Sequence, residues 1–308
     1  MQLIISSSPH LKEKYSISCI MRQVIFALIP AAVASVIFFR HHAILLILLC
    51  VLSCATTEEI IARIYEKKWI IKDFSAVLTG LLLALILPPT TSWYAAILGS
   101  IFAIFVGKHL FGGLGYNIFN PALLGRAFLM ATYPKMLTHY ILPFSLDSMS
   151  NATPLVLRKF NHILVSLKDL FLGNVGGSLG ETSALCLIIG GLYLLIRKVA
   201  DWRIPLSMLV TVIGVSSIFY LINPLNGSPL FHLFNGGFLL GTFFMATDPV
   251  TTPVTKKGRY IFGAGCGILI MVIRIFSGLP EGVMYSILFM NAITPLINRY
   301  TRPKRFGL

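Results

Sequence analysis

The amino-acid sequence predicts an all-α integral membrane protein, and two observations lead to this prediction. Hydrophobic residues make up 56% of the 308-residue chain and charged residues only 12%, with a mean hydropathy of +0.83. A soluble domain with such a surface would aggregate. Continuous apolar runs also recur along the whole chain, separated by short polar segments. One polytopic membrane domain over 1–308 is therefore expected, rather than two soluble domains.

Ten apolar runs are expected to form the transmembrane helices. Several are shorter than the ~20 residues that a perpendicular helix needs, so flanking polar residues and Gly or Pro breaks would complete those spans. The first run is not expected to be a cleaved signal, because about twenty mixed polar residues precede it and more apolar sequence follows its small residues. In chain order the runs are 24–39, 43–57, 74–88, 93–107, 117–132, 182–197, 205–222, 233–247, 260–275 and 283–298.

Lysine and arginine indicate the orientation of these helices. With the N-terminus in the cytoplasm, most of the 25 basic residues fall in cytoplasmic segments, as the positive-inside rule requires. Both termini are then cytoplasmic, and the long segment 133–180 is a periplasmic loop. Topology thus explains the net charge of +14, which does not indicate nucleic-acid binding. The basic residues left outside are Arg40, Lys135, Arg158, Lys159, Lys168 and Arg274.

Cysteine and histidine give no indication of a metal site or a disulfide framework. The five cysteines lie within or beside apolar segments and form no C-x-x-C pair, and the seven histidines show no metal-ligand spacing. Cys50 and Cys54 share one helical face, which packing explains.

Two distant segments resemble each other over sixteen positions, 119–134 and 234–249. Both begin with Phe-Asn and end with Met-Ala-Thr-x-Pro, and half of the positions are identical. In the predicted topology the fifth helix leaves the cytoplasm and the eighth returns to it. The sequence therefore predicts an inverted internal repeat, an architecture that many transporters use to build a site near the middle of the bilayer.

The polar string Asp-Ser-Met-Ser-Asn-Ala-Thr occupies residues 147–153 of the periplasmic loop. Its serines and asparagine favour turns, and Pro154 disfavours helix at Thr153. We expect Thr153 to lie in an exposed, extended loop, and as a sequence feature alone it is one threonine among many.

Further polar residues allow two interpretations each. Gly180, Glu181, Thr182 and Ser183 begin the sixth span either as a helix cap or as a binding site for a flavin phosphate or pyrimidine edge. Arg126 lies within a span and needs a carbonyl, carboxylate, cofactor or water partner, for a functional or a structural reason. A helix stop explains the string at 247–253, which contains Asp248, but its carbonyls and hydroxyls could also hold a cation or a second flavin. The string at 280–283 is explained as the start of the last helix.

Taken together, several of these strings resemble the D subunit of the Rnf ion-translocating electron transport complexes. The resemblance covers nearly the whole chain and extends to the B subunit of the sodium-pumping NADH:quinone reductase, which usually has a longer N-terminal extension. The strings that carry it are Asn-Pro-Ala at 120–122, Gly-Arg-Ala-Phe at 125–128, and the segments 150–155, 180–183, 247–252, 280–291 and 295–296.

The resemblance implies two flavins. In this family the pattern Asp-x-x-Ser/Thr-x-Ala-Thr directs a flavin transferase, outside the cytoplasm, to join FMN to the threonine through a phosphodiester. Here the pattern corresponds to Asp147, Ser150, Ala152 and Thr153, and Asn151 stands where the family usually has glycine. A second, non-covalent riboflavin within the bundle is also implied, although no spacing in the sequence indicates its site.

The resemblance further implies a six-subunit complex of the cell inner membrane. Such a complex moves electrons between reduced ferredoxin and NAD and couples this to Na⁺ or H⁺ movement. Nicotinamide and iron–sulfur chemistry would belong to other subunits, because this chain has neither a dinucleotide-binding fingerprint nor a cysteine cluster. Two alternatives remain: a transporter or channel with an inverted repeat and no covalent flavin, and a scaffold that has lost its cofactor.

Overall fold

The computed structural model is helical. It describes residues 16–65, 73–144, 152–161, 163, 165–181, 183–279 and 281–303, and no β-strand is found among them. Four helices are long and apolar enough to cross a membrane. The predicted all-helical architecture is therefore confirmed, and these four helices suit a membrane protein. They are α1 (Ile17–Phe39), α2 (His41–Ile64), α10 (Arg203–Ile222) and α13 (Lys256–Phe276).

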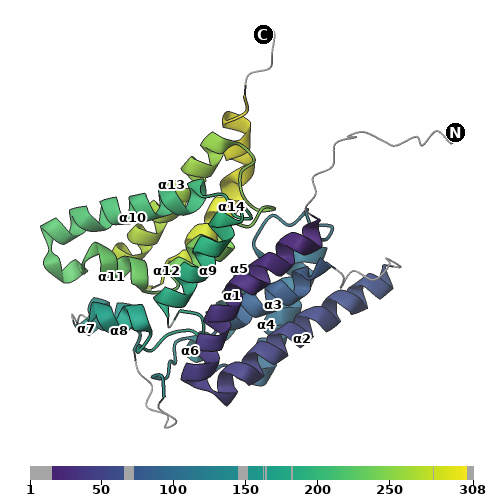
Figure 1. The fold of residues 1–308 in the computed structure, drawn as a ribbon, viewed down its shortest axis with the longest axis horizontal. Helices are drawn as coiled ribbons and strands as arrows, with labels where there is room; N and C mark the ends of the chain where they lie inside the picture. The colour runs from purple at the N-terminus through teal and green to yellow at the C-terminus, as the bar shows by residue number, and fades with distance from the viewer. Residues whose placement is uncertain are drawn as a thin grey trace.

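The other helices complete two groups, which lie on opposite sides of the molecule (Figure 1). The first group contains α1 to α5 and the second α9 to α14, and α1 packs against α9 where the groups meet. Helices α4 and α12 each continue into a short π-helix. The bounds are α3 (Ser75–Ile86), α4 (Trp93–Ile104), η2 (Phe105–His109), α5 (Pro121–Thr132), α6 (Pro134–Leu137), α7 (Pro154–Asn161), α8 (Leu167–Leu172), α9 (Ala184–Ile196), η3 (Pro224–Asn226), α11 (Pro229–Phe234), α12 (Phe238–Leu240), η4 (Gly241–Met245) and α14 (Val283–Tyr300).

Helix α3 lies at the centre of the first group. Ten of its 12 residues are buried, and it packs against α1, α2, α4 and α5. By contrast, α1 and α2 leave large apolar side chains exposed, as lipid-facing helices do. Helix α3 is apolar on all sides and only 12 residues long, and its position is therefore determined by contacts with neighbouring helices rather than with lipid.

The predicted apolar runs each contain a helix, but the eighth run is interrupted. Helix α11 ends at Phe234, and Gly236 and Gly237 then adopt positive φ angles of 63° and 64° before α12 begins. Glycine takes this conformation without strain, so the chain can change direction here. Whether all ten runs cross the bilayer stays a prediction.

The two repeated segments run in opposite directions where they meet. The side-chain amide of Asn120, at the start of 119–134, donates to the carbonyl of Met245, near the end of 234–249, at 3.3 Å. Further along, Arg126 of the first copy and Gly237 of the second both approach the carboxylate of Glu181, so the two copies are antiparallel, as an inverted repeat requires. The copies differ locally, because Pro121 begins α5 directly after Asn120 whereas two glycines follow Asn235. The duplication itself stays a prediction.

Segment 133–180, predicted as a long loop, contains α6, α7 and α8. Leu155, Leu170 and Val175 of this segment form a small hydrophobic core together with Phe231 of α11. The segment is thus packed onto the second group of helices through α11.

Close helix contacts depend on glycines. A methyl group added at Gly190 of α9 would lie 2.1 Å from the carbonyl oxygen of Ala27 in α1, and one at Gly263 of α13 would lie 1.9 Å from the Ser207 hydroxyl in α10. Small residues of this kind let membrane helices approach closely.

We expect Gly190→Ala to lower the stability of the protein by about 1–3 kcal/mol, because backbone would have to move away from the added methyl group. The midpoint of thermal unfolding in detergent measures this effect. Gly214→Ala in α10 is the matched control, since nothing lies within 4 Å of a methyl group there. Equal midpoints for the two variants would contradict the close α1–α9 contact.

Candidate functional site

Thr153 begins α7. Its Oγ1 accepts a hydrogen bond from the backbone N–H of Val156 at 3.4 Å, and its carbonyl accepts one from Leu157 at 2.9 Å. Only 4% of Thr153 is exposed. The prediction that Thr153 is exposed is therefore wrong, and a helix rather than a longer loop follows it. Threonine is a good helix cap and Pro154 suits the first helical position, so the same sequence also favours the start of a helix. That helix packs against the protein through Leu155.

The rest of the predicted attachment signal is described only in part. Ala152 is described, and its carbonyl lies near Gly176. Asp147 and Ser150 lie outside the described residues.

Arg126 is buried within α5 and lies at the centre of a charged cluster. Its guanidinium donates to the carbonyl of Ile86, at the end of α3, and to the carboxylate of Glu281. Its Nη1 also lies 3.6 Å from Oε1 of Glu181. The Tyr140 hydroxyl donates to the other oxygen of Glu281 at 3.0 Å. The predicted need for a carbonyl or carboxylate partner is thus confirmed, and two carboxylates share one guanidinium.

The predicted segment 180–183 supplies part of this cluster. The backbone N–H of Gly180 donates to the carbonyl of Leu85 at 2.7 Å, which ties the segment to the end of α3. Ser183 caps α9 by accepting from the N–H of Cys186 at 3.5 Å, so the helix-cap interpretation is confirmed for this residue. The carboxylate of Glu181 turns instead toward Arg126. Thr182 lies outside the described residues.

A cavity lies between the cluster and α7. It encloses about 520 Å³ of empty space, part of it open to the surroundings, and Val156 of α7 forms part of its wall. Thr153 is three residues before Val156, so the cavity lies close to the predicted attachment residue. Its polar lining comes from Arg126, Thr138, Tyr140, Glu281 and Tyr285.

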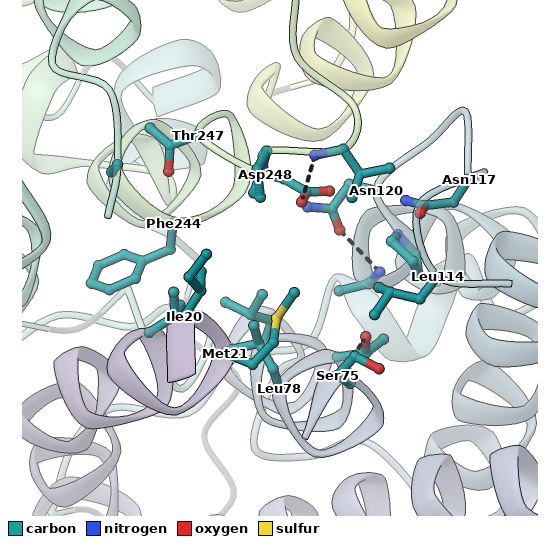
Figure 2. Close-up of a pocket in the computed structure, with 18 of the residues that line it drawn as sticks. Ile20, Met21, Ser75, Leu78, Leu114, Asn117, Asn120, Phe244, Thr247 and Asp248 are labelled. Atoms are coloured by element: carbon teal, nitrogen blue, oxygen red, sulfur yellow. Dashed lines mark hydrogen bonds between the residues drawn. The ribbon is translucent and has the colours of Figure 1, made fainter. Parts of the chain in front are cut away.

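A second pocket lies at the other end of α3, near the start of α1 (Figure 2). It encloses about 760 Å³ of empty space, part of it open, between apolar walls that include Leu78, Leu114 and Phe244. Asn117 and Asn120 contribute amide groups from the segment before α5. The Oδ1 of Asn117 is buried and accepts no hydrogen bond from the part of the chain that the structure describes, whereas Asn120 is satisfied by the Ala122 N–H and the Met245 carbonyl.

Asp248 lies at the rim of this second pocket, after the end of η4. Its carboxylate accepts from the N–H of Val250 and the hydroxyl of Thr251, both at 3.3 Å. Burial raises the pKa of this carboxyl, although these two hydrogen bonds act in the opposite direction. The helix-stop interpretation is confirmed, and the carboxylate also forms part of the pocket wall.

Lys108, on the π-helix η2, also lines the second pocket. Its ammonium group bonds the carboxylate of Glu58 and the hydroxyl of Ser75, and both charged side chains are at most 2% exposed. His109 Nε2 lies 3.9 Å from the same carboxylate. No group of three or more His, Cys, Asp or Glu side chains that could hold a metal ion occurs within the described ranges.

Several of these residues were not identified from the sequence. Glu281 was interpreted only as the start of a helix, and Tyr140, Asn117 and the Lys108–Glu58 pair were not singled out. Glu58 and Lys108 each directly follow an apolar run, but nothing in the sequence pairs them, since 50 residues separate them along the chain.

The fold and its buried charged sites define a helical membrane protein of the multi-pass type. A model described as "NQR2, RnfD, RnfE family" matches residues 4–307. The chain therefore belongs to the NQR2, RnfD, RnfE family.

Its similarity to curated relatives extends over almost the whole chain. The chain is 44% identical to the D subunit of the Na(+)-translocating ferredoxin:NAD(+) oxidoreductase complex of Acetobacterium woodii, covering 100% of the chain and 96% of the relative. It is also 44% identical to the D subunit of the proton-translocating ferredoxin:NAD(+) oxidoreductase complex of Clostridium ljungdahlii, covering 98% and 96%. The D subunit of an ion-translocating oxidoreductase complex from Stutzerimonas stutzeri is 43% identical over 76% of each chain.

We expect Arg126→Met to destabilise the protein by about 3–5 kcal/mol, because two largely buried carboxylates would lose their shared cation. Thermal unfolding in detergent measures the loss. Arg63→Met is the control, since the Arg63 side chain is 72% exposed and its ion pair with Glu59 contributes little. An Arg126→Met protein as stable as the control would show that neither carboxylate needs the guanidinium.

Proposed function

We propose that this chain is the flavin-carrying D subunit of an ion-translocating ferredoxin:NAD oxidoreductase complex. The observation that supports this most strongly is the 44% identity, over nearly the full length of both chains, to relatives named as the D subunit of such complexes. One of those relatives is named as translocating Na⁺ and the other as translocating protons, so the coupling ion is Na⁺ or H⁺. The chain acts in electron transfer and is not catalytic alone.

In this proposal Thr153 carries FMN, attached by a flavin transferase. A phosphodiester on its Oγ1 would lie at the N-terminus of α7, where the helix dipole favours negative charge. The cavity beside Val156 offers apolar walls together with the polar groups of Tyr140 and Arg126, which suits a flavin ring. When bound, FMN supplies one-electron and two-electron redox chemistry. The protein's own cluster of Arg126, Glu181 and Glu281 sets the electrostatic potential around it.

We assign the second pocket to a non-covalent riboflavin. Its apolar walls suit the faces of an isoalloxazine ring, and its amides and hydroxyls suit the polar edge or the ribityl chain. The Asn117 Oδ1 supports this assignment, because a buried acceptor without a protein partner needs a donor from a ligand or water.

The chain is proposed to span the inner membrane ten times with both termini in the cytoplasm. The start of α1 and the end of α14 both lie near segment 247–255, which supports a common side for the two ends. Segment 133–180, with Thr153, then lies in the periplasm, where the transferase acts. Five other subunits of a six-subunit complex would supply the nicotinamide and iron–sulfur chemistry, and lipid surrounds the bundle.

A transporter or channel without covalent flavin is the alternative function. The break at Gly236 and Gly237 and the antiparallel contact between Asn120 and Met245 favour it, because transporters place broken helices at their sites. The retention of flavin after denaturation discriminates between the two functions.

We expect the peptide containing Thr153, from protein co-expressed with its transferase, to be heavier by the mass of FMN less one water. In-gel flavin fluorescence should be present in the wild type and absent in Thr153→Ala, while Ser166→Ala, at an exposed hydroxyl residue of the same segment, keeps it. An unmodified peptide, under conditions where a control acceptor is flavinylated, would favour the transporter.

We expect Asn117→Leu to lose the flavin that denaturation releases, with an affinity at least about tenfold weaker, because one hydrogen bond and the fit of the ring would be lost. Chromatography of the released flavin measures this. The covalent FMN should remain in Asn117→Leu, and Thr153→Ala should keep the releasable riboflavin. If Asn117→Leu retains a full complement of releasable flavin, the second pocket is not its site.

A further inference from the structure

Two consecutive basic residues of α7 bind the second group of helices. The ammonium group of Lys159 donates to the carbonyls of Arg274 at 3.0 Å, Leu279 at 3.3 Å and Ser277. These carbonyls belong to the last turn of α13 and the residues that follow it, where a helix leaves acceptors without intrahelical partners. A cation at this position also complements the negative end of the helix dipole.

Arg158 makes a second set of contacts from the same helix. Its guanidinium donates to the carbonyl of Asn226, at the end of η3, and to that of Arg274 at 3.4 Å, and it lies 2.9 Å from Nε2 of His232. Only 5% of Arg158 is exposed. Burial lowers the pKa of Arg158, and burial together with the neighbouring Arg158 charge lowers that of Lys159. Carbonyl dipoles therefore stabilise both cations. A carboxylate partner would have offset more of the free-energy cost of burying them.

The contacts continue to the break in the eighth run. Arg274 is fully buried in α13 and donates to the carbonyls of His232 at 2.6 Å, Asn235 at 2.8 Å and Gly236 at 3.4 Å. His232 thus joins both arginines, through its ring to Arg158 and through its carbonyl to Arg274. Helix α7, the end of α13, and α11 with the break that follows it thus form one connected unit.

Helix α7 needs such anchors. It has only eight residues, and an isolated helix of that length is unstable in water. Leu155 anchors its first turn in the small core with Leu170, Val175 and Phe231, while Arg158 and Lys159 anchor its second. Thr153 directly precedes the first turn, so the position of its hydroxyl follows the position of the helix.

We propose that Arg158 and Lys159 are positioning residues, which hold α7 against the carbonyl end of α13 and thereby fix the flavin of Thr153 relative to the bundle. This inference rests on the proposed attachment of FMN to Thr153. Electron transfer slows steeply as donor and acceptor move apart, so a loosened α7 would lower the rate while leaving the covalent bond in place. Neither side chain contacts the attachment residue itself in the described structure.

The experiment uses the whole complex with Lys159→Met and, separately, Arg158→Met. We expect flavin attachment, measured by in-gel fluorescence, to stay at the wild-type level. Hydrogen exchange of the α7 amides should become at least about tenfold faster, because local opening would no longer break the anchoring contacts. Electron transfer from reduced ferredoxin to NAD should fall several-fold. Lys159→Arg should restore both readouts, and Lys168→Met, at an exposed site on α8, should change neither.

Three results would overturn the inference. The first is unchanged α7 exchange in both methionine variants, which needs no flavin to be measured. The second is full attachment with wild-type electron transfer despite faster exchange. The third is loss of attachment in Lys159→Met, which would assign the side chain to recognition by the transferase. A wild-type complex without FMN on Thr153 would instead refute the proposed function, and the exchange measurement would still report on the anchor.

Discussion

The burial of charge inside the bundle is the constraint on which this structure depends. Arg126 is only 3% exposed, so its guanidinium requires acceptors from the protein. They come from the end of α3 through Ile86, from the segment before α14 through Glu281, and from the segment before α9 through Glu181. Satisfying one guanidinium thus fixes α5 against three other elements and joins the two groups of helices.

Where a helix is interrupted, the polar groups of the backbone likewise need partners. Inside a membrane every free N–H and carbonyl must find a partner within the protein. Where α3 ends, Leu179 and Gly180 supply N–H donors to Leu87 and Leu85; where η4 ends, Asn120 supplies one. Polar groups at these two helix breaks thus pair with neighbouring protein groups, and the two cavities lie beside the same breaks.

The sequence predicted the helical class and the approximate positions of the helices along the chain, because an apolar run indicates burial, whether in lipid or within the protein. It also predicted that Arg126 needs acceptors, but not which ones, because Glu281 is 155 residues away. Thr153 was misplaced because turn-forming residues and proline fit an extended loop and a helix start equally well. Packing of Leu155 in the small core decides between them, and that core includes Phe231 of α11, which no local pattern reveals. The break at Gly236 was missed although Asn235, Gly236 and Gly237 form a turn signal, because the apolar residues on both sides were taken as one continuous run.

The two proposed flavin sites lie at opposite ends of α3, so the length of this helix sets their separation. Ser75, the first residue of α3, lines the second pocket, while Ile86, the last, accepts from Arg126 beside the first cavity. Eleven steps of an α-helix span roughly 17 Å along its axis. Since ten of the 12 residues of α3 are buried, the path between the sites runs through packed protein rather than water. In the proposed topology electrons would thus cross much of the bilayer within this one chain, whereas the partner subunits would only need to reach its two ends.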